Sequence, residues 1–189
     1  NIWIGTNNGL NFYDVQRRKI RQFQNDPNNN RSLPHNSILC TFVDSKGGVW
    51  IGHAFGLAKW DAAHEDFLKV KLTAMANPIY RMIETHEGLW LGSTRNGLYF
   101  LDRSGAVTKN FSHRENDKQS IASNYVTALY EDSTHILWVG TNQGLNSLHP
   151  GDTTFTSFDK LPRQRVAAIT EDSNHHIIAE FEDNYFRII

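Results

Sequence analysis

The sequence has few of the features that define several other protein classes. It contains one cysteine, Cys40, among 189 residues, so it cannot form an internal disulfide and is not a disulfide-stapled secreted domain. No apolar run is long enough for a membrane-spanning helix, so any membrane attachment is expected through other parts of a longer chain. Its 19 basic and 20 acidic residues are scattered along the chain, which argues against nucleic acid or an anionic membrane surface as a partner of this segment.

Helical periodicity is also absent. No segment longer than a turn spaces its apolar residues as an amphipathic helix would, so very low helix content is expected. The composition is 39% hydrophobic and 12% aromatic, which is typical of a soluble globular protein with a sizeable core. The core is therefore expected to be built from strands.

A short string recurs along the chain. It reads Trp-Val-Gly-Thr-Asn-Gln-Gly-Leu from Trp138, and similar strings begin at Trp3, Trp50 and Trp90, at spacings of 47, 40 and 48 residues. A fifth, degenerate copy has Ile178 at the Trp position. Because the Trp and the apolar residue after it point to opposite faces of a strand, the string predicts a strand buried on both faces.

The Trp and the Gly two positions after it are predicted to be the structural residues of the repeat. They are Trp3, Trp50, Trp90 and Trp138, with Gly5, Gly52, Gly92 and Gly140. Glycine weakens a strand interior, so these glycines predict close approach of a neighbouring backbone. The second Gly of each string is expected to end a tight turn with positive φ.

A full unit contains four strand signals. In the second unit these are Ile38–Val43, Val49–Gly52, Leu57–Trp60 and Asp66–Val70. Four short antiparallel strands in each repeat of this length are typical of a β-propeller blade. We therefore predict an all-β fragment of a β-propeller with about five consecutive blades, the first and last incomplete. The predicted blade units are residues 1–33, 34–76, 77–121, 122–161 and 162–189.

The unit from Ser123 to Leu145 resembles the two-component regulator propeller repeat, and Pro34 to Leu57 is a second match. Gly47 fits the turn glycine of that family, whereas Glu87, His135 and His175 replace it, which affects only a hairpin turn. The resemblance covers essentially the whole chain. It implies a periplasmic sensor region of a hybrid two-component regulator, with propellers of about seven blades. Such a region binds an oligosaccharide and signals through a membrane helix to a histidine kinase.

Seven units need roughly 300 residues by the size of such repeats. The 189 residues therefore cannot close a seven-bladed ring alone. We expect either self-association across the open faces or further blades supplied by a longer chain. The kinase, receiver and DNA-binding parts are not in this sequence, so the segment is expected to be neither an enzyme nor a nucleic-acid binder.

In a propeller, the loops before the first strand of each blade and between its second and third strands open on one face. This face is expected to carry Arg, Tyr and His side chains. The predicted ligand-binding residues are His35, Tyr80, Arg81, Arg95, Tyr125, Arg163 and Arg165. Aromatic rings stack on sugar faces, and Arg binds carboxylates or sulfates. The alternative interpretation is that they are solvated loop tips.

Catalytic and metal-ligating patterns are weak. Asp44, Glu84, Asp132 and Asp172 each precede the Trp position by six residues, and this recurrence favours a structural role. His175 and His176 are adjacent and point apart on an extended strand, which makes a poor chelate. We therefore predict no catalytic residue, no metal ligand and no cofactor. A propeller lyase or glycosidase and a protein-interaction scaffold remain the alternative functions.

Overall fold

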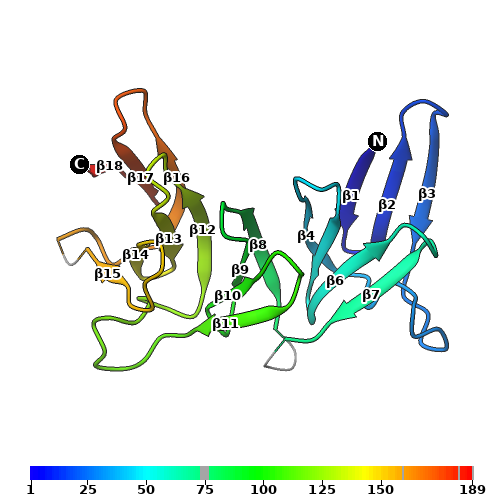
Figure 1. Ribbon diagram of the computed structural model, residues 1–189, viewed down its shortest axis with the longest axis horizontal. Helices are drawn as coiled ribbons and strands as arrows, with labels where there is room; N and C mark the ends of the chain where they lie inside the picture. Colours follow the sequence, from blue (N-terminus) through cyan, green and yellow to red (C-terminus); the bar gives the residue numbers. More distant parts are fainter. Residues whose placement is uncertain (73–76, 159, 183, 189) are drawn as a thin grey trace. The chain divides into compact units, whose positions relative to one another are not determined.

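The computed structural model describes residues 1–72, 77–158, 160–182 and 184–188, and these form strands and turns without any helix. No helix that could cross a membrane is therefore present in the described ranges. The strands build five sheets in which neighbours in the sheet are neighbours in the chain (Figure 1). The all-β prediction is confirmed, and the sheets are consecutive antiparallel blades of a partial β-propeller.

The chain divides into two compact units, Asn1–Met82 and Ile83–Ile189, and the division falls inside strand β8. The first sheet has three strands: β1 (Ile2–Thr6), β2 (Gly9–Asp14) and β3 (Lys19–Phe23). The second has four: β4 (Ile38–Val43), β5 (Val49–His53), β6 (Gly56–Asp61) and β7 (Asp66–Val70). The third has four: β8 (Ile79–Glu84), β9 (Leu89–Ser93), β10 (Leu98–Leu101) and β11 (Val107–Phe111).

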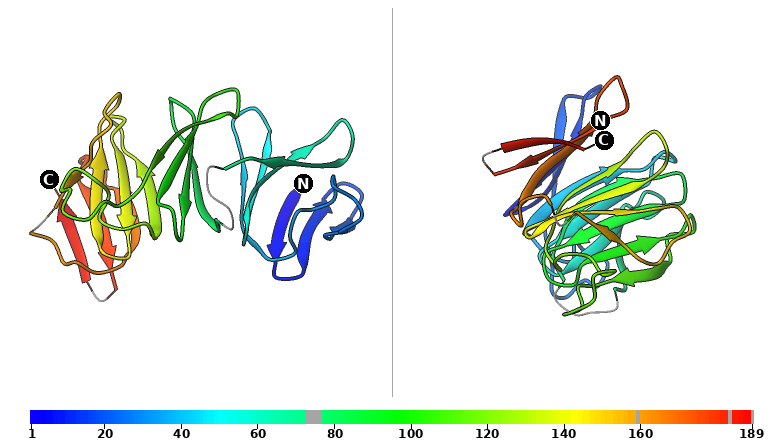
Figure 2. Two further views of the ribbon diagram at one scale, coloured as in Figure 1. Left: turned by 90° about the horizontal axis from the view of Figure 1, so that it is seen from below. Right: turned by 90° about the vertical axis from the view of Figure 1, so that its left-hand side faces the viewer.

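The last two sheets lie wholly in the second unit. The fourth sheet contains β12 (Val126–Glu131), β13 (Leu137–Thr141), β14 (Gly144–Leu148) and β15 (Thr156–Ser157). The fifth contains β16 (Val166–Glu171), β17 (Ile177–Phe181) and β18 (Asn184–Ile188). Figure 2 shows the meander of each sheet from two further directions. The strand pattern of the second unit, applied to the fourth, predicts a last strand over residues 155–158. This prediction is wrong in length, because only two of these residues pair with β14.

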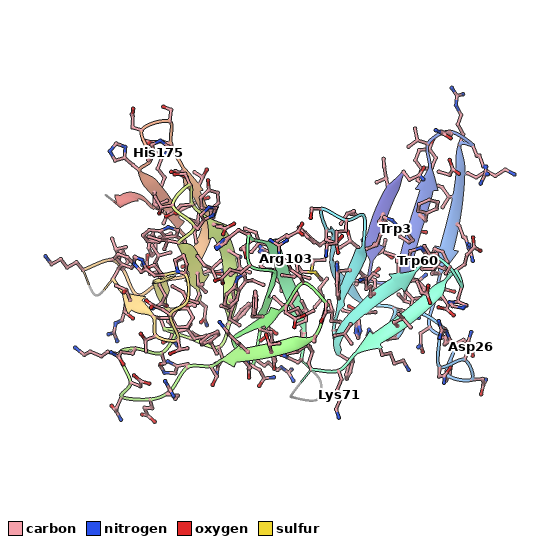
Figure 3. The ribbon with its side chains drawn as sticks, viewed as in Figure 1. Trp3, Asp26, Trp60, Lys71, Arg103 and His175 are labelled. Carbon is pink, nitrogen blue, oxygen red and sulfur yellow. The ribbon has the colours of Figure 1, made fainter. Side chains whose placement is uncertain are left out.

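The Trp-containing strands β5, β9 and β13 are buried along their whole length, as the apolar pairs predict. Trp90 and Trp138 are 2% and 6% exposed. The corresponding strand β1 differs, because Trp3 is only half-buried and Ile4 is 47% exposed. Trp3 instead packs on Trp60 of the second sheet, with ring centroids 5.3 Å apart (Figure 3). One face of β1 therefore lacks the cover that buries β5, β9 and β13.

The strand glycines mark close approach between blades. A Cβ atom on Gly52 would lie 2.6 Å from the carbonyl oxygen of Ile79 at the start of the next blade, as predicted. At Gly5 and Gly140 the prediction of a neighbouring backbone is wrong, because the nearest atoms belong to the side chains of Ile38, 2.5 Å away, and Val166, 2.8 Å away. The turn glycines have the expected positive φ, with values of 106° at Gly9 and 123° at Gly144.

Candidate functional site

The loops predicted to share a face do meet within single blades. The turn between the second and third strands of a blade donates a backbone hydrogen bond to the segment that leads into the first strand. These bonds join Asn142 N to Tyr125 O, Glu182 N to Arg165 O and Ala54 N to Ser37 O. Each of these three blades therefore presents the two loops side by side.

The polar loop of residues 112–121, here called the insert loop, follows β11 in the third blade unit and is held together by hydrogen bonds within itself. The Oγ atom of Ser120 accepts a hydrogen bond from Arg114 N (3.0 Å) and donates to Asp117 O (2.9 Å). The next residue, Ile121, is fully buried and anchors the end of the loop in the core. The polar loop of residues 24–33 in the first unit repeats this arrangement, because Ser32 Oγ bonds both backbone groups of Asp26 and Leu33 is fully buried.

A pocket of about 350 Å³ opens beside this loop in the second unit. Three segments line it: residues of the insert loop together with Ala122 after it, residues 143–145 where the β13–β14 turn enters β14, and residues of β15 and of the connection that follows it. Buried Asn146 holds these segments together. Its Oδ1 accepts from Ala122 N (2.9 Å), while its Nδ2 donates to Ser157 Oγ (2.8 Å). The pocket is therefore framed by fixed backbone rather than by loop tips alone.

Its rim is polar and contains both signs of charge. Arg114 pairs with Asp117 within the loop at 2.7 Å, and the lining residues Lys118 and Arg163 are exposed. Buried Leu145 and Ile121 supply the apolar part of the lining. An apolar floor with a few polar groups and cations is suited to a polyhydroxylated ligand, including one that carries an acidic group.

Of the predicted ligand residues in the second unit, only Arg163 lines this pocket. Tyr125 is 37% exposed and precedes β12, and Arg165 is half-buried before β16. Arg95 is exposed in the β9–β10 turn. The pocket residues Lys118, Gln143 and Ser157 were not predicted. In the sequence, the feature that could have indicated the pocket is the polar insert loop, which makes the third blade unit longer than units without such a loop.

The other predicted ligand residues lie in the first unit. His35 stands beside the β5–β6 turn, with its ring 4.8 Å from exposed Phe55 and 6.3 Å from buried His53. Burial lowers the pKa of His53 to about 4, and the nearby charges of His35 and Lys69 act in the same direction. Tyr80 and Arg81 are half-buried in β8, where the Arg81 guanidinium lies 4.4 Å from the Tyr80 ring centroid.

The recurring acidic residues belong to the turns between the first and second strands of the blades. Asp44 accepts a hydrogen bond from Trp50 Nε1 at 2.8 Å, and Asp132 accepts one from Trp138 Nε1 at 2.7 Å. The assignment of Glu84 to this position is wrong, because the β8–β9 turn is one residue shorter. Thr85 occupies the turn position and bonds Gly88 O, while Glu84 ends β8 as Glu131 ends β12.

These turns also bring together a group that the sequence did not reveal. His86, Glu131 and His135 place potential metal-ligating atoms within 4.8 Å of one another. His86 and Glu131 are 45 residues apart in the chain. The turns of the fourth and fifth blades hold Ser133, Glu171 and His175 in the same relationship.

Comparison with known proteins places these features in a family context. Residues 32–54 and 120–143 match the two-component regulator propeller family. A histidine kinase of Formosa agariphila is 27% identical over 98% of this chain, which spans only 14% of that protein. The extracellular domain of a putative hybrid two-component system from B. thetaiotaomicron has a TM-score of 0.77 and 22% identity, covering 98% of this chain and 25% of that one.

Enzymes of the same fold are also similar in structure. Virginiamycin B lyase from Staphylococcus aureus has a TM-score of 0.72 and 17% identity, with 98% of this chain and 62% of that chain covered. At this identity the likeness concerns the fold alone. The two matched segments include the strings at Trp50 and Trp138 from which the repeat was recognised. The chain therefore carries repeats of the two-component regulator propeller family, as its sequence predicted.

Proposed function

We propose that this chain is part of the extracytoplasmic, ligand-sensing propeller of a two-component regulator and that its ligand is an oligosaccharide. The observation that carries the proposal is the match of two separate repeats to the two-component regulator propeller family. The relative named as a histidine kinase, similar over 98% of this chain, adds support. In this view the segment binds the oligosaccharide and transmits the signal. The phosphorylation is carried out by a kinase elsewhere in the regulator, on the inner side of the membrane.

The pocket beside the insert loop is the proposed contact surface for the sugar. Lys118 and Arg163 offer cationic donors at its rim, and Gln143 and Ser157 offer neutral hydrogen-bonding groups. A volume of about 350 Å³ lies within the range of small-molecule sites. Because Asn146 fixes the walls, a ligand meets a largely preformed site and loses little affinity to ordering of the loops.

Calorimetry with a panel of neutral and acidic oligosaccharides on the regulator's complete sensor region tests this proposal. The expected result is one binding sugar class, with affinity weakened more than about tenfold, or 1.4 kcal/mol, in Arg163→Ala and Lys118→Ala. Arg17→Ala is the matched control, because its side chain is 80% exposed and lies in the other unit. Absence of binding to any sugar contradicts the ligand class, and unchanged affinity in both pocket variants contradicts the pocket.

If the protein cleaves a sugar and the sugar does not trigger signalling, the lyase or glycosidase alternative is favoured. Capture of a defined protein partner, with no sugar changing the melting temperature, favours the scaffold alternative. The seven-blade total, the periplasmic location and the other predicted ligand residues of both units stay predictions.

A further inference from the structure

The side chains of His86, Glu131 and His135 converge between two neighbouring blade turns. His86 lies in the β8–β9 turn, Glu131 ends β12, and His135 lies in the β12–β13 turn. The Glu131 Oε1 atom is 2.5 Å from His86 Nδ1 and 3.4 Å from His135 Nδ1. The two imidazole rings lie with their centroids 4.2 Å apart. We propose that these three residues, here called the turn cluster, bind a divalent transition metal, best matched by zinc.

The donor set and the spacing fit this ion. Two imidazole nitrogens and one carboxylate oxygen are a common three-ligand set for zinc, with a fourth position left for water. Donors about 2.0–2.1 Å from a tetrahedral ion stand roughly 3.3 Å apart. The separation of His135 Nδ1 and Glu131 Oε1 already has this value, at 3.4 Å. The His86 side chain is 40% exposed, so it has room to move from hydrogen-bond distance of Glu131 to that spacing.

The surroundings leave room for one small ion. The turn cluster lines part of a hollow with a volume of about 10 Å³, close to what a single water-sized sphere occupies. The hollow is also lined by Lys109, His149 and Asp152. The Glu131 side chain is only 16% exposed, so its carboxylate is held in place rather than free in solvent. Arg103 donates to His86 O at 2.5 Å and ties down the turn that carries the first histidine.

The next pair of blades supplies an internal comparison. Glu171 ends β16 as Glu131 ends β12, and His175 has φ 64° where His135 has φ 68°. Ser133 occupies the place of His86, with its Oγ 2.5 Å from Glu171 Oε1. Ser133, Glu171 and His175 therefore provide one imidazole, whereas the turn cluster provides two. In the second blade the equivalent turn position is Gly47, with φ 81°.

A metal bound by the turn cluster would join the turns of the third and fourth blades. Its three ligands come from both turns, so the ion binds only when the two blades are packed together. Because such a ligand stabilises the folded state over the unfolded one, zinc is expected to raise the melting temperature. The site is distinct from the pocket beside the insert loop, with which it shares no lining residue.

The test is a titration of the purified, chelator-treated protein with ZnCl₂, read by calorimetry and by melting temperature. One zinc per chain and a rise in melting temperature are expected. His86→Ser introduces the residue type that Ser133 has in the next blade. His135→Gly introduces the residue type of Gly47 in the second blade, and glycine keeps the positive φ of this turn position. Both variants should weaken zinc binding more than about tenfold and abolish the thermal shift.

Three further variants guard against misleading results. His175→Gly makes the same change in the neighbouring turn and should bind zinc as the unchanged protein does. Ser133→His supplies the missing imidazole and should add a second equivalent of zinc. Glu131→Gln keeps the volume of the side chain and provides a loss-of-binding variant if His86→Ser fails to fold. No binding by the unchanged protein, or equal binding by His86→Ser, His135→Gly and His175→Gly, overturns the proposal and leaves a hydrogen-bonded cluster only.

Discussion

The indole nitrogen of Trp138 donates a 2.7 Å hydrogen bond to the Asp132 carboxylate, six residues earlier in the chain. The same carboxylate accepts from the backbone of Thr134 and Ile136, which shapes the turn between β12 and β13. Burial raises the pKa of Asp132, but the donors from Trp138, Thr134 and the backbone outweigh it, so the pKa lies below its usual value. One acidic residue thus fixes both the turn and the buried Trp of the blade.

Removal of this Trp should be costly. Trp138→Ala is expected to destabilise the protein by about 3–5 kcal/mol, because it leaves a cavity among buried side chains. Trp138→Phe keeps a ring but deprives Asp132 of a donor, with an expected cost of about 1–3 kcal/mol. Denaturant unfolding measures both. Trp60→Phe is the control, because within the described residues Trp60 makes ring contacts and its indole has no hydrogen bond; equal costs for the two Phe variants contradict the role of Asp132.

Gly52→Ala should destabilise the packing of the second blade against the strand that follows it. The added Cβ would lie 2.6 Å from both Cys40 Sγ and Ile79 O, and a backbone oxygen cannot rotate away as a side chain can. We expect a loss of about 1–3 kcal/mol, measured by thermal or denaturant unfolding. Gly47→Ala is the comparison, since its Cβ meets nothing within 4 Å and only its positive φ of 81° opposes the change. A smaller loss at Gly52 than at Gly47 contradicts the close-approach argument.

Stability should fall with acidification before the carboxylates titrate. The pKa of His53 is about 4 in the folded protein and about 6.5 when unfolded, so the unfolded state binds more protons between these values. Stability is therefore lost as the pH falls from about 6.5 towards 4, by on the order of 3 kcal/mol.

Unfolding free energies of the unchanged protein and His53→Gln, measured between pH 7 and 4, check this expectation. His53→Gln keeps a polar side chain in that place and should flatten the pH dependence. His64→Gln, at a side chain 68% exposed, is the control and should retain the slope. The same slope in all three proteins would rule out His53 as its source.

The uncovered face of β1 predicts self-association. Ile2 and Ile4 are 50% and 47% exposed on this edge strand, and apolar edge strands favour pairing with another chain. Light scattering at low micromolar concentration is expected to find assemblies larger than a monomer. The double variant Ile2→Glu/Ile4→Glu should shift them to monomer, whereas Val15→Glu in the β2–β3 turn, at a residue 49% exposed, should not. A monomeric unchanged protein that binds no hydrophobic dye would contradict the prediction.

The sequence by itself determined the blades. Strand limits such as Ile38–Val43 and Asp66–Val70 were predicted to the residue, because alternation, turn glycines and the Trp string are local signals that each repeat restates. The repeat also indicated the family. The error at Glu84 arose because a turn shortened by one residue shifts the register of the acidic position without changing the local composition.

The tertiary structure decided which side chains meet between blades. Arg163 was predicted as a ligand residue. Lys118 lines the same pocket only because the insert loop of the third blade unit lies near the connection between β15 and β16. His86 and Glu131 are 45 residues apart, at equivalent turns of neighbouring blades, but the repeat does not tell which side chains of two such turns meet. Each blade forms from contacts near in sequence, whereas a site between blades depends on the packing of one sheet against the next, and that packing is set by buried residues remote from the site itself.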